Sequence, residues 1–167
     1  QQEGQLHWRP ETLTLQTWLE EQVALFQQLA ELKNIQLQLS PLPVYRFNAD
    51  EQILSVIFRN LLSNALKFTR SNGQIQISAS YEEGQGWIHI EDNGIGIPQD
   101  EIHKLFDQEQ KKVRNGTAQE KGSGLGLTLV QDLLQLYKGE LTVSSTEGAG
   151  TVFSFSLPQR LMDQTSG

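Results

Sequence analysis

The chain has 167 residues and a formal net charge of −7, and 37% of its residues are hydrophobic. This is enough for one domain with its own core, and the acidic balance argues against a general nucleic-acid binder, which is usually basic. The sequence contains no cysteine, which excludes a disulfide scaffold and a cysteine zinc site and fits a reducing compartment. No apolar run approaches the roughly 18 residues of a membrane span, so we expect a cytoplasmic domain without a membrane segment.

The first part of the chain predicts a helix, two short strands and a longer helix. Apolar residues recur at helical spacing in residues 17–33, and residues 35–39 alternate between apolar and polar, as a strand with one buried face does. A second short strand is expected at 44–47. Asp50 is a typical helix N-cap, and the residues after it predict a long helix over about 51–68.

Beyond this helix the sequence predicts two hairpins, separated by two helices and a long loop. Residues 107–123 are polar and lack periodicity, and loops of this length are often lids over a functional site. The other expected elements are strands at 74–81 and 87–91, helices near 99–106 and 124–137, and strands at 139–145 and 151–157.

This order of elements predicts an α+β fold, because the strands do not alternate strictly with helices. We expect a two-layer α/β sandwich with helices on one face of a mixed, largely antiparallel sheet. The strands alternate in polarity, which indicates one covered face and one wetter face. The expected domain spans residues 12–158, between a linker at 1–11 and a tail at 159–167.

Three polar side chains on the long expected helix form a first candidate site. Asn60, Asn64 and Lys67 are spaced i, i+4 and i+7 and therefore share one narrow helix face. Two amides and an ammonium group suit hydrated Mg²⁺ with phosphate, because Mg²⁺ prefers oxygen ligands and retains water. Asparagine is a poor helix former, so two in mid-helix call for a reason. The alternative is a solvated polar face.

The turn after the strand at 87–91 forms a second candidate site. It reads EDNGIGIP, with a carboxylate at Asp92 followed by two glycines. Glycine permits close backbone approach to a ligand, and a carboxylate at such a turn can accept a hydrogen bond from an exocyclic amine such as that of adenine. The alternative is an ordinary turn, because Asp-Asn-Gly is favourable turn chemistry.

A third candidate site is the stretch KGSGLGL at residues 121–127, which places three alternating glycines at the start of an expected helix. Free N–H groups and the helix dipole make such a terminus an anion site. The pattern is neither the dinucleotide fingerprint nor a Walker A loop, and the HRD and DFG strings of protein kinases do not occur. The alternative is a flexible hinge.

In this order and at these separations, the three stretches resemble the N, G1 and G2 boxes of the histidine-kinase catalytic domain. That domain has the Bergerat fold, which it shares with gyrase, heat-shock chaperone and mismatch-repair ATPases. The string KLF at 104–106 resembles the F box, and GAGTVF at 148–153 resembles the last glycine box. The resemblance covers roughly residues 12–158 and implies a Bergerat fold with a long ATP lid.

The resemblance also implies a role for each matching residue. Asn64 is the expected Mg²⁺ ligand, and Asn60 and Lys67 are expected to contact phosphate or the water shell of the metal. Asp92 is expected to bind the adenine amino group, and Thr151 to buttress the base pocket. The other expected nucleotide contacts are Phe68, Gly94, Gly96, Ile97 and Ile102 around the base, and Arg114, Lys121, Gly122, Gly124, Leu125 and Gly126 at the phosphates.

Asn60 favours the kinase branch of the family, whose hydrolytic members have a glutamate base at this position. An amide cannot take a proton at neutral pH, so we expect transfer of the γ-phosphate of Mg-ATP to a histidine instead of hydrolysis. None of His7, His89 and His103 lies in a string resembling the acceptor box. The resemblance therefore implies an acceptor on a separate helical dimerisation domain of the parent protein, with a response regulator as indirect partner.

Two other functions are compatible with the same residues. One is a nucleotide-sensing module that binds ATP without transferring phosphate. The other is a serine kinase of the anti-sigma-factor type, which has the same fold and a different acceptor. A histidine-bearing domain added in trans would distinguish histidine transfer from both, and a serine-phosphorylated partner would support the last.

Overall fold

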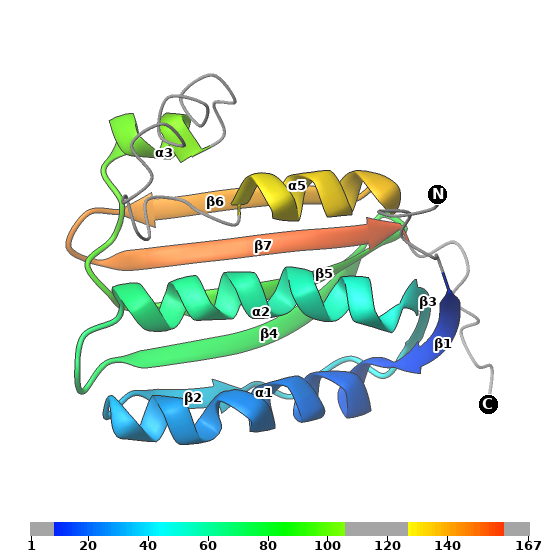
Figure 1. The fold of residues 1–167 in the computed structure, drawn as a ribbon, viewed down its shortest axis with the longest axis horizontal. Coiled ribbons are helices and arrows are strands. Elements are labelled where there is room, and N and C mark those ends of the chain that lie inside the picture. Colours follow the sequence, from blue (N-terminus) through cyan, green and yellow to red (C-terminus); the bar gives the residue numbers. More distant parts are fainter. Residues whose placement is uncertain (1–8, 106–126, 159–167) are drawn as a thin grey trace, which may run out of the picture.

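The computed structural model describes residues 9–105 and 127–158. In these ranges the chain folds into two layers, with helices across one face of a sheet (Figure 1). This confirms the predicted α+β sandwich. The elements are β1 (Pro10–Thr14), α1 (Leu15–Leu32), β2 (Gln36–Leu39), β3 (Arg46–Asp50), α2 (Glu51–Phe68), β4 (Gln74–Glu82), β5 (Gln85–Asp92), α3 (Gln99–Leu105), α5 (Leu127–Leu136), β6 (Glu140–Thr146) and β7 (Gly150–Pro158).

The main sheet has the strand order β2-β4-β5-β7-β6. β2 pairs parallel with β4, whereas the other three pairings are antiparallel, as expected for a mixed and largely antiparallel sheet. A separate two-stranded sheet joins β1 to β3 at one end of the molecule (Figure 1). β1 was not predicted, because most of its side chains are exposed and it has no alternating pattern.

The core lies between the helix layer and the inward face of the sheet. α2 buries apolar residues at helical spacing, including Leu54, Phe58 and Leu61. The sheet contributes alternate strand residues to the core, because side chains at i and i+2 share a face. These are Ile75 and Ile77 on β4, Ile88 and Ile90 on β5, and Phe153 and Phe155 on β7. The other face of the sheet is mainly polar, as predicted.

The expected helix at 51–68 has the predicted bounds, and its predicted N-cap is present. Oδ1 of Asp50 accepts hydrogen bonds from the backbone N–H groups of Gln52 and Ile53, at 3.0 and 3.2 Å. The hydroxyl of Tyr137 accepts from the backbone N–H of Asp50 at 2.9 Å and donates to its carbonyl oxygen at 3.0 Å. Oδ2 of Asp50 accepts from the backbone N–H of Arg9 at 2.8 Å.

The strand expected at 44–47 lies further along the chain than predicted. β3 begins at Arg46 and ends at Asp50, because its register is set by pairing with β1, and Val44 is 95% exposed. The predicted loop at 107–123 and the first residues of the helix expected at 124–137 lie outside the described residues. No helix in the described ranges is long and apolar enough to cross a membrane.

Candidate functional site

Asp92 is the last residue of β5, and its carboxylate is buried with only half of its hydrogen-bonding capacity used. Oδ1 accepts from the backbone N–H groups of Gly94 at 2.8 Å and Thr151 at 3.3 Å. Oδ2 is buried and has no partner among the described residues. Because a buried polar atom without a partner is costly, Oδ2 calls for a donor that the described residues do not supply.

Burial raises the pKa of Asp92 above its ordinary value, and the negative charge of Glu91 acts in the same direction. The two backbone N–H groups at Oδ1 oppose this shift, because they stabilise the charged form. A further N–H donor at Oδ2 would also favour the carboxylate. Asp92 therefore combines a raised pKa with one oxygen that has no partner among the described residues.

The turn after Asp92 packs tightly against the end of α2. The backbone N–H of Ile95 donates to the carbonyl of Phe68 at 3.1 Å. A Cβ on Gly94 would lie 2.1 Å from the same carbonyl oxygen, so only glycine fits there. Gly94 thus holds the turn close to α2, on the same helix end as the predicted residues Asn64 and Lys67.

Gly96 lies on the opposite side of this turn, against the loop between β6 and β7. Its φ is +74°, and a Cβ there would lie 2.2 Å from the carbonyl oxygen of Thr146. The backbone N–H of Gly148 donates to the carbonyl of Ile95 at 2.7 Å. The turn that carries Asp92 is therefore held between α2 and the β6–β7 loop.

Ser145 is a site residue that sequence reasoning missed. Its Oγ accepts from the backbone N–H of Ile97 at 2.7 Å, donates to the carbonyl of Gly150 at 2.9 Å, and lies 2.8 Å from Oγ1 of Thr151. Ser145 and Thr151 are both buried. A signal was present in the sequence, because Ser145 continues the inward alternation of Leu141 and Val143 and is thus an inward polar residue.

The polar face of α2 lies at the helix end that contacts the Asp92 turn. Asn60 and Asn64 are half-buried and Lys67 is exposed. Nδ2 of Asn60 donates to the carbonyl of Val56 at 2.7 Å, which leaves the amide oxygen, the atom able to bind a cation, outside this hydrogen bond. Phe68 ends the helix and is also half-buried.

Three elements bring the candidate residues to one end of the fold. The C-terminal end of α2 contacts the turn that follows β5, and α5 packs beside α2 and begins at the same end (Figure 1). Ile97 is buried and Ile102 on α3 is packed against the core. The remaining predicted residues lie outside the described ranges: Arg114, Lys121, Gly122, Gly124, Leu125 and Gly126.

Of the two described histidines, His89 lies on the sheet face opposite the helices, whereas His103 lies on α3 next to Ile102. Nε2 of His89 lies 3.0 Å from Oγ of Ser80, and its Nδ1 lies 2.7 Å from Oγ of Ser154, on the polar face of the sheet. His103 is exposed on α3. His89 is thus held by two neighbouring strands, as expected for a structural residue.

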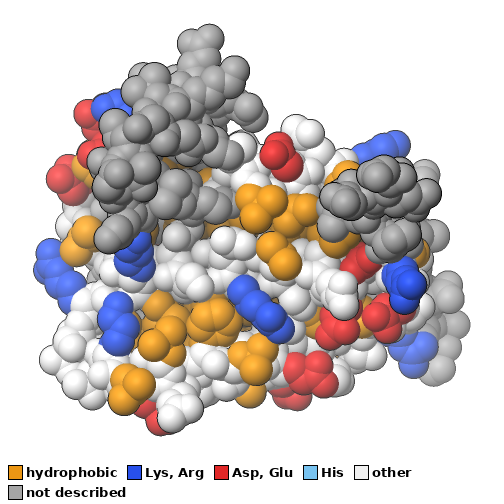
Figure 2. All heavy atoms as spheres, viewed as in Figure 1, with side chains coloured by type: hydrophobic (Ala, Val, Ile, Leu, Met, Phe, Trp, Pro, Cys, Tyr) orange, Lys and Arg blue, Asp and Glu red, His pale blue; other side chains and the backbone are white. Residues whose placement is uncertain are grey.

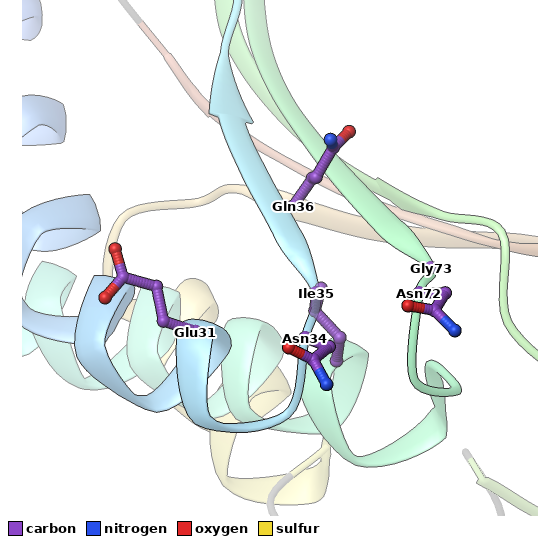
Figure 3. Close-up of a pocket in the computed structure, with 6 residues that line it drawn as sticks. All are labelled: Glu31, Asn34, Ile35, Gln36, Asn72 and Gly73. Atoms are coloured by element: carbon purple, nitrogen blue, oxygen red, sulfur yellow. The ribbon is translucent and has the colours of Figure 1, made fainter.

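A hollow of about 470 Å³ lies beside the turns that follow α1 and α2, and Figure 3 shows its lining. Asn34 and Asn72 lie in these turns with positive φ, and the backbone N–H of Asn72 donates to the carbonyl of Asn34. The hollow is lined by Glu31, Asn34, Ile35, Gln36, Asn72 and Gly73. None of these residues is predicted to bind nucleotide, so the hollow is separate from the site at Asp92.

The fold and this site define a class of ATP-binding domain. A helix layer covers one face of a mixed sheet, and a buried carboxylate at the end of a central strand faces a glycine turn beside a polar helix end. Residues 49–161 match the family model described as histidine kinase-, DNA gyrase B- and HSP90-like ATPase. The chain belongs to this family, whose members use ATP.

The relatives include proteins named as histidine kinases. The chain is 38% identical over 133 residues to the aerobic respiration control sensor protein ArcB of Escherichia coli, covering 77% of this chain and 17% of ArcB. It is 33% identical over 113 residues to the sensor histidine kinase WalK of Bacillus subtilis, covering 66% of this chain and 18% of WalK. The chain thus spans less than a fifth of the length of these two relatives.

Solved structures show the same fold. The catalytic domain of the histidine kinase ThkA superposes with a TM-score of 0.76 at 24% identity, covering 90% of this chain and 98% of that one. Full-length ShkA in complex with AMPPNP superposes with a TM-score of 0.74 at 29% identity, covering 93% of this chain and 32% of that one. The two-layer fold described above is therefore that of histidine kinase catalytic domains.

Proposed function

We propose that this domain binds Mg-ATP and donates the γ-phosphate to a histidine on a separate helical dimerisation domain, as the catalytic domain of a two-component sensor kinase. The observation that carries the proposal is the buried Oδ2 of Asp92, which has no partner among the described residues. The exocyclic amine of adenine is a donor of the right kind for this oxygen. Guanine presents the acceptor O6 at the corresponding position.

The surroundings of Asp92 support its role as a fixed acceptor. Two backbone N–H groups hold Oδ1, which leaves the carboxylate no freedom to turn. Ser145 ties Thr151 to Ile97, and therefore links the strand behind the carboxylate to the chain beyond the turn. A base pocket built in this way is formed before the ligand arrives, which reduces the cost of binding.

The end of α2 supplies residues that suit a metal and phosphates. The amide oxygen of Asn64 is the hard type of ligand that Mg²⁺ accepts, and Asn60 and Lys67 lie on the same helix face. Bound Mg²⁺ would neutralise charge on the phosphates during transfer. We propose that Asn64 binds this ion, and that Lys67 and the glycines at 122, 124 and 126 bind phosphate.

Asn60 supports transfer over hydrolysis. Its amide nitrogen is already used as a donor to the carbonyl of Val56, and its oxygen cannot accept a proton at neutral pH. The chain therefore has no base at this position to activate water. An external imidazole nitrogen is itself a nucleophile and needs only to be positioned in line with the phosphate.

The helix layer offers apolar surface that a helical acceptor domain can cover. Val56 on α2 is 38% exposed one turn from Asn60, and Leu129 on the adjacent α5 is 45% exposed. Figure 2 shows hydrophobic side chains gathered on this face. We propose that residues 1–11, of which Pro10 and Glu11 begin β1, connect the domain to its acceptor, and that a response regulator receives the phosphate afterwards.

The proposal is tested by calorimetry with AMPPNP, with Mg²⁺ and with EDTA, followed by incubation with ATP and a helical histidine domain. We expect binding that weakens in EDTA and a phosphohistidine on the added domain. An absence of AMPPNP binding under both conditions would contradict the nucleotide site. Binding without transfer to several acceptor domains would favour a nucleotide-sensing module, and phosphoserine on a partner would favour the anti-sigma-factor type.

A further inference from the structure

The polar face of the sheet contains a hollow that the nucleotide site does not use. Its volume is about 390 Å³, and it lies over β5, β6 and β7 near the turn between β4 and β5. Its residues on β5 alternate with Ile88 and Ile90, which face the core, so the hollow opens on the side of the sheet opposite the helices. The lining residues are Glu82, Glu83, Gln85, Trp87, His89, Glu140, Thr142 and Ser154.

The rim of this hollow is negatively charged. Three of its lining residues are the carboxylates Glu82, Glu83 and Glu140, and the described lining contains no lysine or arginine. The outer face of β5 carries a fourth carboxylate, Glu91, two residues beyond His89. Like charges gathered around a concave surface concentrate a field that attracts cations and repels phosphate groups.

The floor of the hollow is aromatic and held in place. The rings of Trp87 and His89 are stacked, with centroids 6.3 Å apart and planes 6° from parallel. Both nitrogens of His89 lie within hydrogen-bonding distance of serine hydroxyls, those of Ser80 and Ser154. A tryptophan face attracts a cation through its ring quadrupole, and here the ring does not need to be ordered on binding.

His89 does not add a competing positive charge to this floor. Burial lowers its pKa below the ordinary value, against the smaller opposite effects of Glu82 and Glu91. The imidazole is therefore neutral at pH 7. The net charge of the described lining at that pH comes from the three carboxylates.

Gln85 adds an acceptor that lacks a donor. Its Oε1 is buried without a hydrogen-bond partner in the described part of the chain, and the residue lines the hollow. A small movement of this side chain would let the oxygen accept an N–H group from a ligand in the hollow. No group of three or more His, Cys, Asp or Glu residues in the described ranges could hold a metal ion, so a bare divalent cation does not fit this arrangement.

We infer that this hollow binds an arginine side chain presented by a basic segment of a partner protein. A guanidinium is planar, stacks on an aromatic face and has five N–H donors for carboxylates and an amide oxygen, whereas an ammonium group does not stack in this way. The hollow is separate from the proposed ATP site, because it lies on the other face of the sheet from Asp92.

The test uses the domain labelled with ¹⁵N and two blocked peptides, Gly-Arg-Gly-Arg-Gly and Gly-Lys-Gly-Lys-Gly. We expect the arginine peptide to shift the indole N–H signal of Trp87 and the amide signals around His89, with the lysine peptide binding several-fold more weakly. In the variant Glu82→Gln/Glu83→Gln/Glu140→Gln, binding of the arginine peptide should weaken about tenfold or more.

Two controls keep the result interpretable. AMPPNP affinity should be the same in the triple variant and the wild type, which shows that the domain is folded and the nucleotide site intact. A second variant, Trp87→Leu, should lose the preference for arginine over lysine. The inference is overturned if the arginine peptide leaves Trp87 and His89 unshifted, if lysine binds equally well, or if the triple variant binds as tightly as the wild type.

Discussion

The backbone N–H of Thr151 lies 3.3 Å from Oδ1 of Asp92, where β7 and β5 pair in register. The two residues are pairing partners at the end of β5, and both are buried. Oδ1 is thereby bound within the protein, and Oδ2 is the oxygen that we propose accepts from the adenine amine. The proposed acceptor is thus part of the sheet itself and is held by a paired strand.

Asp92→Asn should lower ATP affinity by at least about tenfold. Hydrogen bonds to a charged group contribute roughly 1.5–3 kcal/mol, and an asparagine whose oxygen stays with the two backbone N–H groups would present an NH₂ donor to the adenine amine. Calorimetry with AMPPNP measures the effect. Glu91→Gln is the matched control, because it removes one charge from the exposed neighbouring residue. An equal loss of AMPPNP affinity in both variants would show that Asp92 contributes only through its negative charge and not through a specific hydrogen bond.

The same substitution should stabilise the ligand-free domain at neutral pH. The pKa of Asp92 is raised in the folded state, so the folded state binds its proton more tightly than the unfolded state. Protonation therefore favours folding, and the penalty of the buried charge grows as pH rises from the ordinary value of 3.8 through the raised pKa. Thermal melts should show a higher Tm for Asp92→Asn near pH 7 and a smaller difference near about pH 4. A difference that is constant with pH would contradict this explanation.

Asn64→Ala should reduce phosphotransfer to a supplied histidine domain by about a hundredfold or more. A metal that polarises phosphate supplies several kcal/mol, and each 1.36 kcal/mol is about a factor of ten in rate. The measurement is the single-turnover rate with excess enzyme. Ser63→Ala changes the exposed adjacent residue of the same helix and should leave the rate unchanged. A normal rate in Asn64→Ala would refute its assignment as the Mg²⁺ ligand.

Ser145→Ala should cost about 1–3 kcal/mol of unfolding free energy, because it leaves the buried N–H of Ile97 without its acceptor. It should also weaken AMPPNP binding, since Thr151 loses the hydroxyl that positions it. Urea denaturation gives the first quantity and calorimetry the second. Ser144→Ala, on the exposed face of the same strand, is the control. If both variants unfold at the same urea concentration, the bonds of Ser145 contribute nothing measurable.

Alanine substitutions at two glycines should distinguish the cost of a steric clash from the cost of backbone strain. Gly96 and Gly148 both have positive φ, +74° and +86°, but a Cβ on Gly96 would meet the carbonyl oxygen of Thr146 at 2.2 Å, whereas nothing lies within 4 Å at Gly148. Gly148→Ala should cost about 1–2 kcal/mol from strain alone. Gly96→Ala should cost clearly more and disturb the turn after Asp92. Comparable urea midpoints for the two variants would show that the turn yields easily.

The sequence predicted those parts of the fold whose pattern is local. The long helix began and ended as expected, because Asp50 is a good N-cap and the apolar stripe that includes Leu54, Phe58 and Leu61 is regular. β1 was missed because its pairing with β3 spans about 36 residues of sequence and leaves most of its side chains exposed. That pairing also places β3 later in the chain than its composition indicated.

The site was predictable by residue type and less so by geometry. The sequence identified Asp92 as an acceptor, but only the structure shows which of its oxygens is used internally. Ser145 was recognisable as an inward polar residue, yet its bonds to Ile97 and Thr151 depend on a turn whose path no local pattern specifies. The phosphate-binding glycines remain predictions, since they lie outside the described residues.

Asp50 joins three parts of the chain, two of which are distant from it in sequence. Its carboxylate accepts hydrogen bonds from the N–H of Arg9 and from the first amides of α2. The hydroxyl of Tyr137, next to the end of α5, bonds both backbone groups of Asp50. α2 and α5 are thus both attached to Asp50 at one end of the helix layer. Their opposite ends lie beside the residues that we propose bind the nucleotide. A force on the segment before β1 would act on both helices through Asp50, so we expect their ends at the proposed ATP site to move together and not one at a time.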